Sequence, residues 1–161
     1  MKTKKQTLNL KPFFMKKILL SFALFATVGI TAAFASEDVK VSKQVLSAFQ
    51  TDFNAAKNVR WSQEDEFYKA SFTNMDMQVE AYYDELGQLM GSVRRLSIEQ
   101  LPLAIIHEFN RRFQDAPVLN VTEITNLDGT SYRIWTEKGN KQYKLKANAS
   151  GEIIVLDKKK K

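Results

Sequence analysis

The second half of this chain repeats the first half, and that repetition limits the folds it can adopt. Residues 41–56 align with residues 101–116 at a constant offset of 60. Three aligned pairs are identical: Phe49 with Phe109, Phe53 with Phe113, and Ala56 with Ala116. Further along the chain the offset is 64, and it aligns Tyr68 with Tyr132, Gln78 with Gln142, and Gly87 with Gly151. A repeated pattern of this kind indicates one supersecondary unit that is used twice.

The positive charge of the chain is concentrated near its two ends. Of the 24 Lys and Arg residues, six lie in residues 1–35, which contain no acidic residue. Residues 36–161 therefore carry 18 basic and 18 acidic residues, and without residues 158–161 the balance is 14 to 18. A nucleic-acid-binding protein needs its cations gathered on a folded face. The charge pattern therefore argues against nucleic acid as a partner.

Residues 1–35 have the features of an export signal. Met15 and two lysines precede an apolar run over residues 18–30, and Ala33 and Ala35 form a small-x-small cleavage site. The run is shorter than the roughly 20 residues that span a bilayer, so a cleaved signal is favoured over a retained anchor. We expect cleavage after Ala35 and a periplasmic or secreted mature protein. Either Met1 or Met15 can be the true start.

The chain contains no cysteine. An exported domain without disulfides must be held together by its apolar core. The absence of cysteine near the cleavage site also excludes a lipoprotein anchor.

Apolar residues recur at every fourth position in two stretches, which predicts two amphipathic helices. The recurring residues are Val41, Val45, Phe49 and Phe53 in the first stretch, and Leu101, Ile105, Phe109 and Phe113 in the second. Pro102 favours a start of the second helix near itself, because proline fits the first turn of a helix. Residues 97–100 also match a capping box, which would start that helix earlier. The alignment with the first helix favours a turn there.

After each predicted helix, apolar and polar residues alternate with a period of two, which is typical of half-buried strands. Short runs of turn residues separate the alternating segments, and connections this short join antiparallel neighbours. In one of these turns we expect Gly87 to adopt a positive φ. The pattern predicts eight strands, over residues 57–62, 66–73, 77–83, 88–95, 117–125, 130–137, 140–147 and 152–157.

A helix followed by four strands, used twice, predicts an α+β fold. We expect two tandem helix-plus-four-strand repeats that form one antiparallel sheet, with both helices on one face and their apolar stripes in a shared core. The predicted division of the chain is a signal peptide at 1–35, a short linker at 36–40, a first repeat at 41–96, a second repeat at 97–157 and a basic, solubilising tail at 158–161.

The order of these motifs resembles that of the PepSY-like, β-lactamase-inhibitor-like proteins that Bacteroidetes-type bacteria export. The resemblance covers residues 41–157 and rests on the segments 58–61, 68–72 and 84–89, together with Leu101-Pro102, Tyr132 and Gly151. It implies a periplasmic or secreted domain of tandem PepSY-like α+β units. By analogy with β-lactamase inhibitor protein, it also implies a curved sheet whose free concave face grips a partner.

The residue types that catalysis or metal binding needs do not occur at workable spacing. His107 is the only histidine, and we expect it on the solvent side of the second helix, without a ligand cluster beside it. The acidic run over residues 64–66 lacks the spacing of a calcium loop and fits a hairpin tip. The sequence therefore predicts that the protein is not an enzyme and uses no metal and no cofactor.

The sheet face opposite the helices is the candidate partner-binding surface. Aromatic residues and arginine are the types enriched in binding hot spots. The alternative is that cross-strand pairs of these residues only stabilise a solvent-exposed sheet. The residues assigned to this face by alternation are Phe67, Lys69, Tyr82, Arg94, Arg133, Trp135 and Lys144, with Met90, Lys146 and Ile154 in addition.

These observations predict an exported, non-enzymatic binding module, inhibitor-like in its use of an open sheet face. Its expected partner is a protein or peptide of the cell envelope, and we expect the chain to be monomeric or weakly self-associating. The alternative is a structural, self-assembling envelope protein without inhibitory activity.

Overall fold

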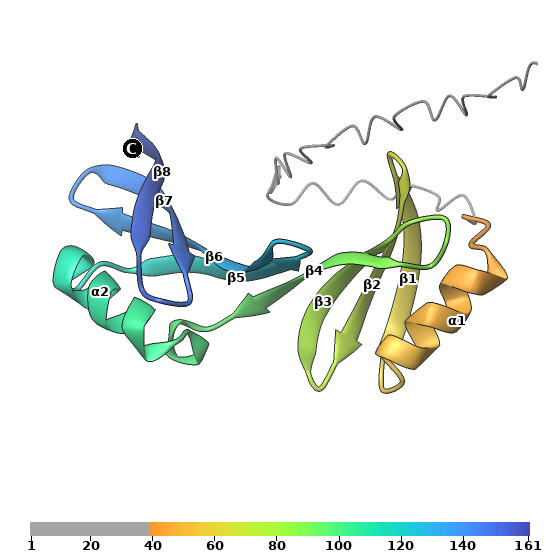
Figure 1. The fold of residues 1–161 in the computed structure, drawn as a ribbon. Helices are drawn as coiled ribbons and strands as arrows, with labels where there is room; N and C mark the ends of the chain where they lie inside the picture. The colour runs from red at the N-terminus through yellow and green to blue at the C-terminus, as the bar shows by residue number, and fades with distance from the viewer. Residues whose placement is uncertain (1–38) are drawn as a thin grey trace, which may run out of the picture. The chain divides into compact units, whose positions relative to one another are not determined.

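The computed structural model describes residues 39–161, which contain two α-helices, one 3₁₀ turn and eight strands (Figure 1). The expected signal peptide, its cleavage after Ala35 and residues 36–38 lie outside the described residues. The helices are α1 (Lys43–Asp52) and α2 (Leu103–Phe113), and the 3₁₀ turn is η1 (Ile98–Gln100). The strands are β1 (Lys57–Glu64), β2 (Phe67–Asn74), β3 (Met77–Tyr83), β4 (Leu89–Leu96), β5 (Val118–Asn126), β6 (Gly129–Lys138), β7 (Lys141–Asn148) and β8 (Ile153–Lys160).

The eight strands form one open sheet in which each strand pairs antiparallel with the next along the chain, in the order β1 to β8. The α+β class and the single antiparallel sheet are therefore confirmed. All eight predicted strands are present, with ends shifted by at most three residues. The largest shift is at β8, where residues 158–160 continue the strand along β7 and so belong to the sheet.

The strand register places both helices on the same face of the sheet. Val79 belongs to the cluster of buried residues around α1, and Tyr132 belongs to the cluster around α2. In the ladder, Val79 lies opposite Arg94, Arg94 opposite Glu123, and Glu123 opposite Tyr132. Directly paired residues point to the same side of a sheet, so this row joins the two helix-covered regions on one face.

Both helices begin where the sequence predicts. The Ser42 hydroxyl accepts a hydrogen bond of 3.2 Å from the Val45 N–H and caps α1. Pro102 occupies the corresponding position before α2. The preceding capping-box segment forms the separate turn η1, in which the Gln100 side chain accepts a 2.8 Å hydrogen bond from the Ser97 N–H. The predicted turn before Pro102 is therefore confirmed.

The prediction of one shared core is wrong, because the buried apolar residues fall into two clusters. In one cluster, Val45 and Phe49 of α1 pack against β2 and β3. In the other, residues of α2 pack against β5, β6 and β7. The reason lies on the same sheet face at the β4–β5 pair, where Arg94 Nε donates a 2.6 Å hydrogen bond to Glu123 Oε1. A charged pair at the strands that join the two regions interrupts the apolar surface.

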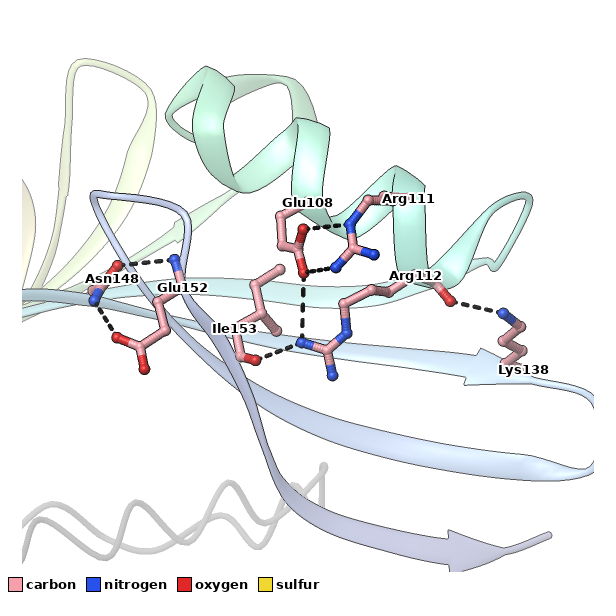
Figure 2. Close-up of polar contacts among 7 residues, drawn as sticks. All are labelled: Glu108, Arg111, Arg112, Lys138, Asn148, Glu152 and Ile153. Atoms are coloured by element: carbon pink, nitrogen blue, oxygen red, sulfur yellow. Dashed lines mark hydrogen bonds and ion pairs between the residues drawn. The ribbon is translucent and has the colours of Figure 1, made fainter.

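The turns after β3 and β7 have the same construction although their residues differ. Asp84 Oδ1 accepts hydrogen bonds from two following backbone N–H groups, at 2.9 and 2.7 Å. In the second turn, Asn148 Oδ1 takes this role and accepts from the Glu152 N–H at 3.1 Å (Figure 2). The glycines of these turns, Gly87 and Gly151, have φ values of 77° and 92°, which confirms the positive φ predicted for Gly87.

Polar contacts fix the end of α2 against the sheet, as Figure 2 shows. The Arg112 guanidinium donates to the backbone carbonyl of Ile153 in β8. Lys138 Nζ donates a 2.7 Å hydrogen bond to the Arg112 carbonyl near the C-terminus of α2. Arg111 pairs with Glu108 within the helix at 2.7 Å.

Neither helix of residues 39–161 is long and apolar enough to cross a membrane.

Candidate partner-binding face

We define the open face as the side of the sheet opposite α1 and α2. Within residues 39–161 all strands belong to the one sheet and both helices pack on its other side, so no helix or strand of this part covers the open face. Lys69 lies opposite Tyr82, and Trp135 lies opposite Lys144, in directly paired positions. Six of the seven residues assigned to this face from the sequence lie on it: Phe67, Lys69, Tyr82, Arg133, Trp135 and Lys144.

Arg94 is the exception, and the assignment to the open face is wrong for this residue. The pairing of β3 with β4 shifts by one residue after Tyr82, and Met90 is the extra residue of the resulting β-bulge. A bulge reverses the side on which each later residue of the strand lies. Arg94 therefore points to the helix-covered face, where Glu123 raises the pKa of its guanidinium through their hydrogen bonds. Arg95 takes the open face instead.

Three cations lie in one cross-strand row on the open face, and we call them the cationic row: Arg95 of β4, Arg133 of β6 and Lys146 of β7. Thr122 of β5 lies between the two arginines in the register. None of the three cations forms an ion pair with another residue of the described chain. Sequence reasoning missed Arg95, and only the position of the bulge at Met90 could have identified it.

Arg133 is the most unusual member of the row. Its Nη1 atom is buried and has no hydrogen-bond partner. Burial lowers the pKa of this guanidinium, because a charged group loses favourable contact with water. A buried donor without an acceptor costs about 1–3 kcal/mol of stability. The open face therefore holds a donor that the described residues do not satisfy.

Trp135 lies beside the cationic row on the same face, two residues after Arg133 in β6. Lys144 Nζ lies 4.8 Å from the centre of the Trp135 ring, within the range of a cation–π contact. Asp157 lies opposite Lys144 in β8. These three residues line a shallow depression, and the exposed Leu119 side chain adds to its apolar wall.

On the part of the open face formed by β1 to β3, several polar groups have partners within the chain, although Arg60 of β1 forms no ion pair with another described residue. Lys69 forms an ion pair with Glu64. The Tyr82 hydroxyl donates a 3.1 Å hydrogen bond to Glu80. Burial raises the pKa of the Tyr82 hydroxyl above its ordinary value, and the carboxylates of Glu80 and Glu64 raise it further. The three cations of the cationic row have no such partners.

Of the residues considered for metal binding, Glu64 lies on the open face, where it pairs with Lys69. His107 is exposed on α2, as the sequence predicts, and residues 65–66 form the tip of the β1–β2 hairpin. Within residues 39–161, no group of three or more His, Cys, Asp or Glu side chains is placed to hold a metal ion.

No protein-family model and no curated protein matches this chain. Solved structures do share its architecture. A BLIP-like protein from Bacteroides fragilis NCTC 9343 superposes with a TM-score of 0.63 and 22% identity, covering 74% of this chain and 85% of that chain. The fold of this chain is therefore similar to that of a BLIP-like protein. A protein from Bacteroides eggerthii DSM 20697, described as a candidate periplasmic protein, gives a TM-score of 0.64 and 20% identity over 74% of this chain and 88% of that one.

A DUF2874 family protein from Bacteroides ovatus ATCC 8483 gives a TM-score of 0.62 and 23% identity over 73% of this chain and 86% of that chain. Likeness at this level of identity shows a shared fold and does not carry function with it. The β-lactamase-inhibitor-like part of the predicted resemblance is therefore supported at the level of fold, and the PepSY-like part stays a prediction.

Proposed function

We propose that this chain is an exported, non-enzymatic binding module that grips a protein partner with the open face of its sheet, in an inhibitor-like manner. The observation that carries the proposal is the unsatisfied Nη1 atom of Arg133, whose nearest neighbour along β6 on the same face is Trp135. Tryptophan and arginine are the residues most enriched where binding energy is concentrated. A site of this composition, on a face that no described element covers, fits a protein partner better than a purely structural sheet.

The organisation that we propose for the binding module is two tandem repeats over residues 41–96 and 97–157, behind a signal peptide at 1–35. A pair of equivalent contacts supports the duplication. A Cβ atom added at Gly87 would lie 3.1 Å from the Gln44 carbonyl of α1, and one added at Gly151 would lie 2.8 Å from the Ala104 carbonyl of α2. The helix residues are separated by 60 positions and the glycines by 64, the same offsets that align the two halves of the sequence.

Site-specific photo-crosslinking tests the proposed function. Trp135 is replaced by p-benzoylphenylalanine, and Leu103, which is 83% exposed on α2, is replaced in a control. Irradiation in cells that express the protein should give one foreign protein adduct at position 135 and none at position 103. Adducts at both positions, or at neither, would contradict a partner-binding role of the open face.

Intact-mass measurement of the exported chain should also give a mature N-terminus at Ser36.

A structural, self-assembling role is the second candidate, and the edge of the sheet favours it. Among the strands of residues 39–161, β8 pairs only with β7, and its residues Ile154, Val155 and Leu156 are 48%, 44% and 49% exposed. An edge strand with exposed apolar side chains is a template for pairing with another chain. Sedimentation velocity should then show concentration-dependent dimers that a Val155→Lys substitution abolishes. A crosslink from position 135 to a second copy of the chain would also favour this role.

A further inference from the structure

The cationic row restricts the chemistry of the partner. Strands of a sheet lie about 4.8 Å apart, so the backbones of Arg133 and Lys146 on neighbouring strands are about 5 Å apart, and the backbone of Arg95 is about 10 Å from that of Arg133. Thr122 lies between the two arginines in the register, and its own side chain is buried, with 8% of its surface exposed. The backbone positions of the three cations therefore span about 14 Å across β4 to β7.

Carboxylates of the chain itself do not serve this row. On the open face, Glu64 pairs with Lys69, and Glu80 accepts the hydrogen bond of Tyr82. Asp157 pairs with Lys159 at 3.5 Å. The described residues therefore leave the row without an acidic partner, and the buried Arg133 Nη1 atom without an acceptor.

We propose that the cationic row binds the carboxylates of an acidic segment of a partner protein, laid in extended conformation across β4 to β7. Alternate side chains of an extended segment lie about 7 Å apart on one side, a spacing that long Arg and Lys side chains can match. Arg133 supplies a planar fork that binds a carboxylate through two parallel hydrogen bonds. The Trp135 ring, two residues after Arg133 in β6, covers an apolar side chain of the same segment. This inference rests on the proposed function, because it assigns the chemistry of the partner at the same face.

The charge of the whole domain favours a short acidic protein segment over a polyanion. Residues 36–161, which include the lysines of β8, carry 18 basic and 18 acidic residues, so they have no net positive charge. A nucleic acid or an anionic membrane would contact many acidic residues of this formally neutral domain as well as the row. A segment with a few carboxylates reaches only the row.

Fluorescence anisotropy tests the inference with a defined probe. The labelled peptide Gly-Ser-Glu-Val-Glu-Val-Glu-Ser-Gly is titrated with mature protein, and a peptide with Gln in place of each Glu serves as the ligand control. The double variant Arg133→Gln with Lys146→Gln should bind the acidic peptide about tenfold or more weakly, since each charge-assisted hydrogen bond is a strong one. The matched variant Lys43→Gln with Lys141→Gln removes two cations away from the row and should change binding less than about twofold.

Equal weakening by both double variants would show that only net charge acts, and would overturn the inference. Tighter binding of single-stranded oligo-dT, or of vesicles of phosphatidylcholine with phosphatidylglycerol, would assign the row to another class of partner and would also overturn it. Absence of any binding to the wild-type chain has the same consequence. Thermal unfolding of each variant establishes whether it is folded. We expect the variants at Arg133 to be folded, because loss of an unsatisfied buried donor should not lower stability.

The crosslinking experiment separates this inference from the proposed function. If the partner is still captured from position 135 in the Arg133→Gln, Lys146→Gln background, the acidic-segment inference fails and the binding module stands. If no partner is captured from position 135 in the wild-type background, the proposed function itself fails.

Discussion

Replacing Gly151 by alanine should destabilise the protein strongly, for two separable reasons. The φ of Gly151 is 92°, a conformation that costs an L-residue about 1–2 kcal/mol. A Cβ atom there would also lie 2.8 Å from the Ala104 carbonyl in the first turn of α2, so the helix or the turn must move. Overpacking of this kind costs about 1–3 kcal/mol. Together these terms predict a loss of about 2–5 kcal/mol in the free energy of unfolding, measured by urea denaturation with an unchanged m-value.

Two other glycines separate the steric cost from the conformational cost. Gly139 has a φ of 61° and no atom within 4 Å of an added Cβ, so Gly139→Ala should lose only the conformational share, about 1 kcal/mol. Gly87 has a φ of 77° and a Cβ position 3.1 Å from the Gln44 carbonyl, so Gly87→Ala should fall between the two. Equal losses for Gly151→Ala and Gly139→Ala would refute the argument, because the contact with α2 would then contribute nothing.

Three further predictions concern the open face and the core. Arg133→Met should raise the free energy of unfolding by about 1 kcal/mol in a urea titration, because it removes the buried donor that has no partner; a loss of stability would contradict this. Phe109→Ala should cost about 3–5 kcal/mol, whereas Trp135→Ala on the open face should cost much less; equal losses would place Trp135 in a core. The Tyr83 hydroxyl donates to Asp52 at 2.9 Å, and burial followed by this contact raises its pKa. The contribution of this hydroxyl to the free energy of unfolding is therefore complete below the ordinary tyrosine pKa of about 10, and it falls as the pH rises further. In urea titrations at several alkaline pH values, the free energy of unfolding should decline less steeply for Tyr83→Phe than for the wild-type protein.

The sequence was sufficient to predict the elements of the fold, because each rests on a local pattern. The i+4 stripe through Phe109 specifies α2, and Pro102 specifies its start. The alternation of apolar residues gives the strands, and residues of the type at Asp84 and Gly87 give the turns between them. Consecutive pairing of neighbouring strands then follows from the short connections.

The division of the core into two clusters could not be predicted in the same way, because it depends on which residues meet across β4 and β5. The Arg94–Glu123 pair is separated by 29 positions in the sequence, and no periodicity connects its members. The residues of the candidate site were predicted correctly only where the alternation between the two faces of each strand was uninterrupted. One extra residue, Met90, reversed the phase of β4 beyond it, and the bulge has no mark in the alternation itself.

Arg94 and Arg95 are adjacent in the sequence, and β4 places them on opposite faces of the sheet. Arg94 makes two hydrogen bonds to Glu123 between the two cores, so the fold explains its presence. Arg95 begins a row of cations that have no acidic partner among residues 39–161, and that row includes the unsatisfied Nη1 atom of Arg133. Stability does not explain such residues, since removing Arg133 is expected to stabilise the chain. An interaction with an external acidic group does explain them, and for this reason the open face, rather than the helix-covered face, is where a partner should be sought.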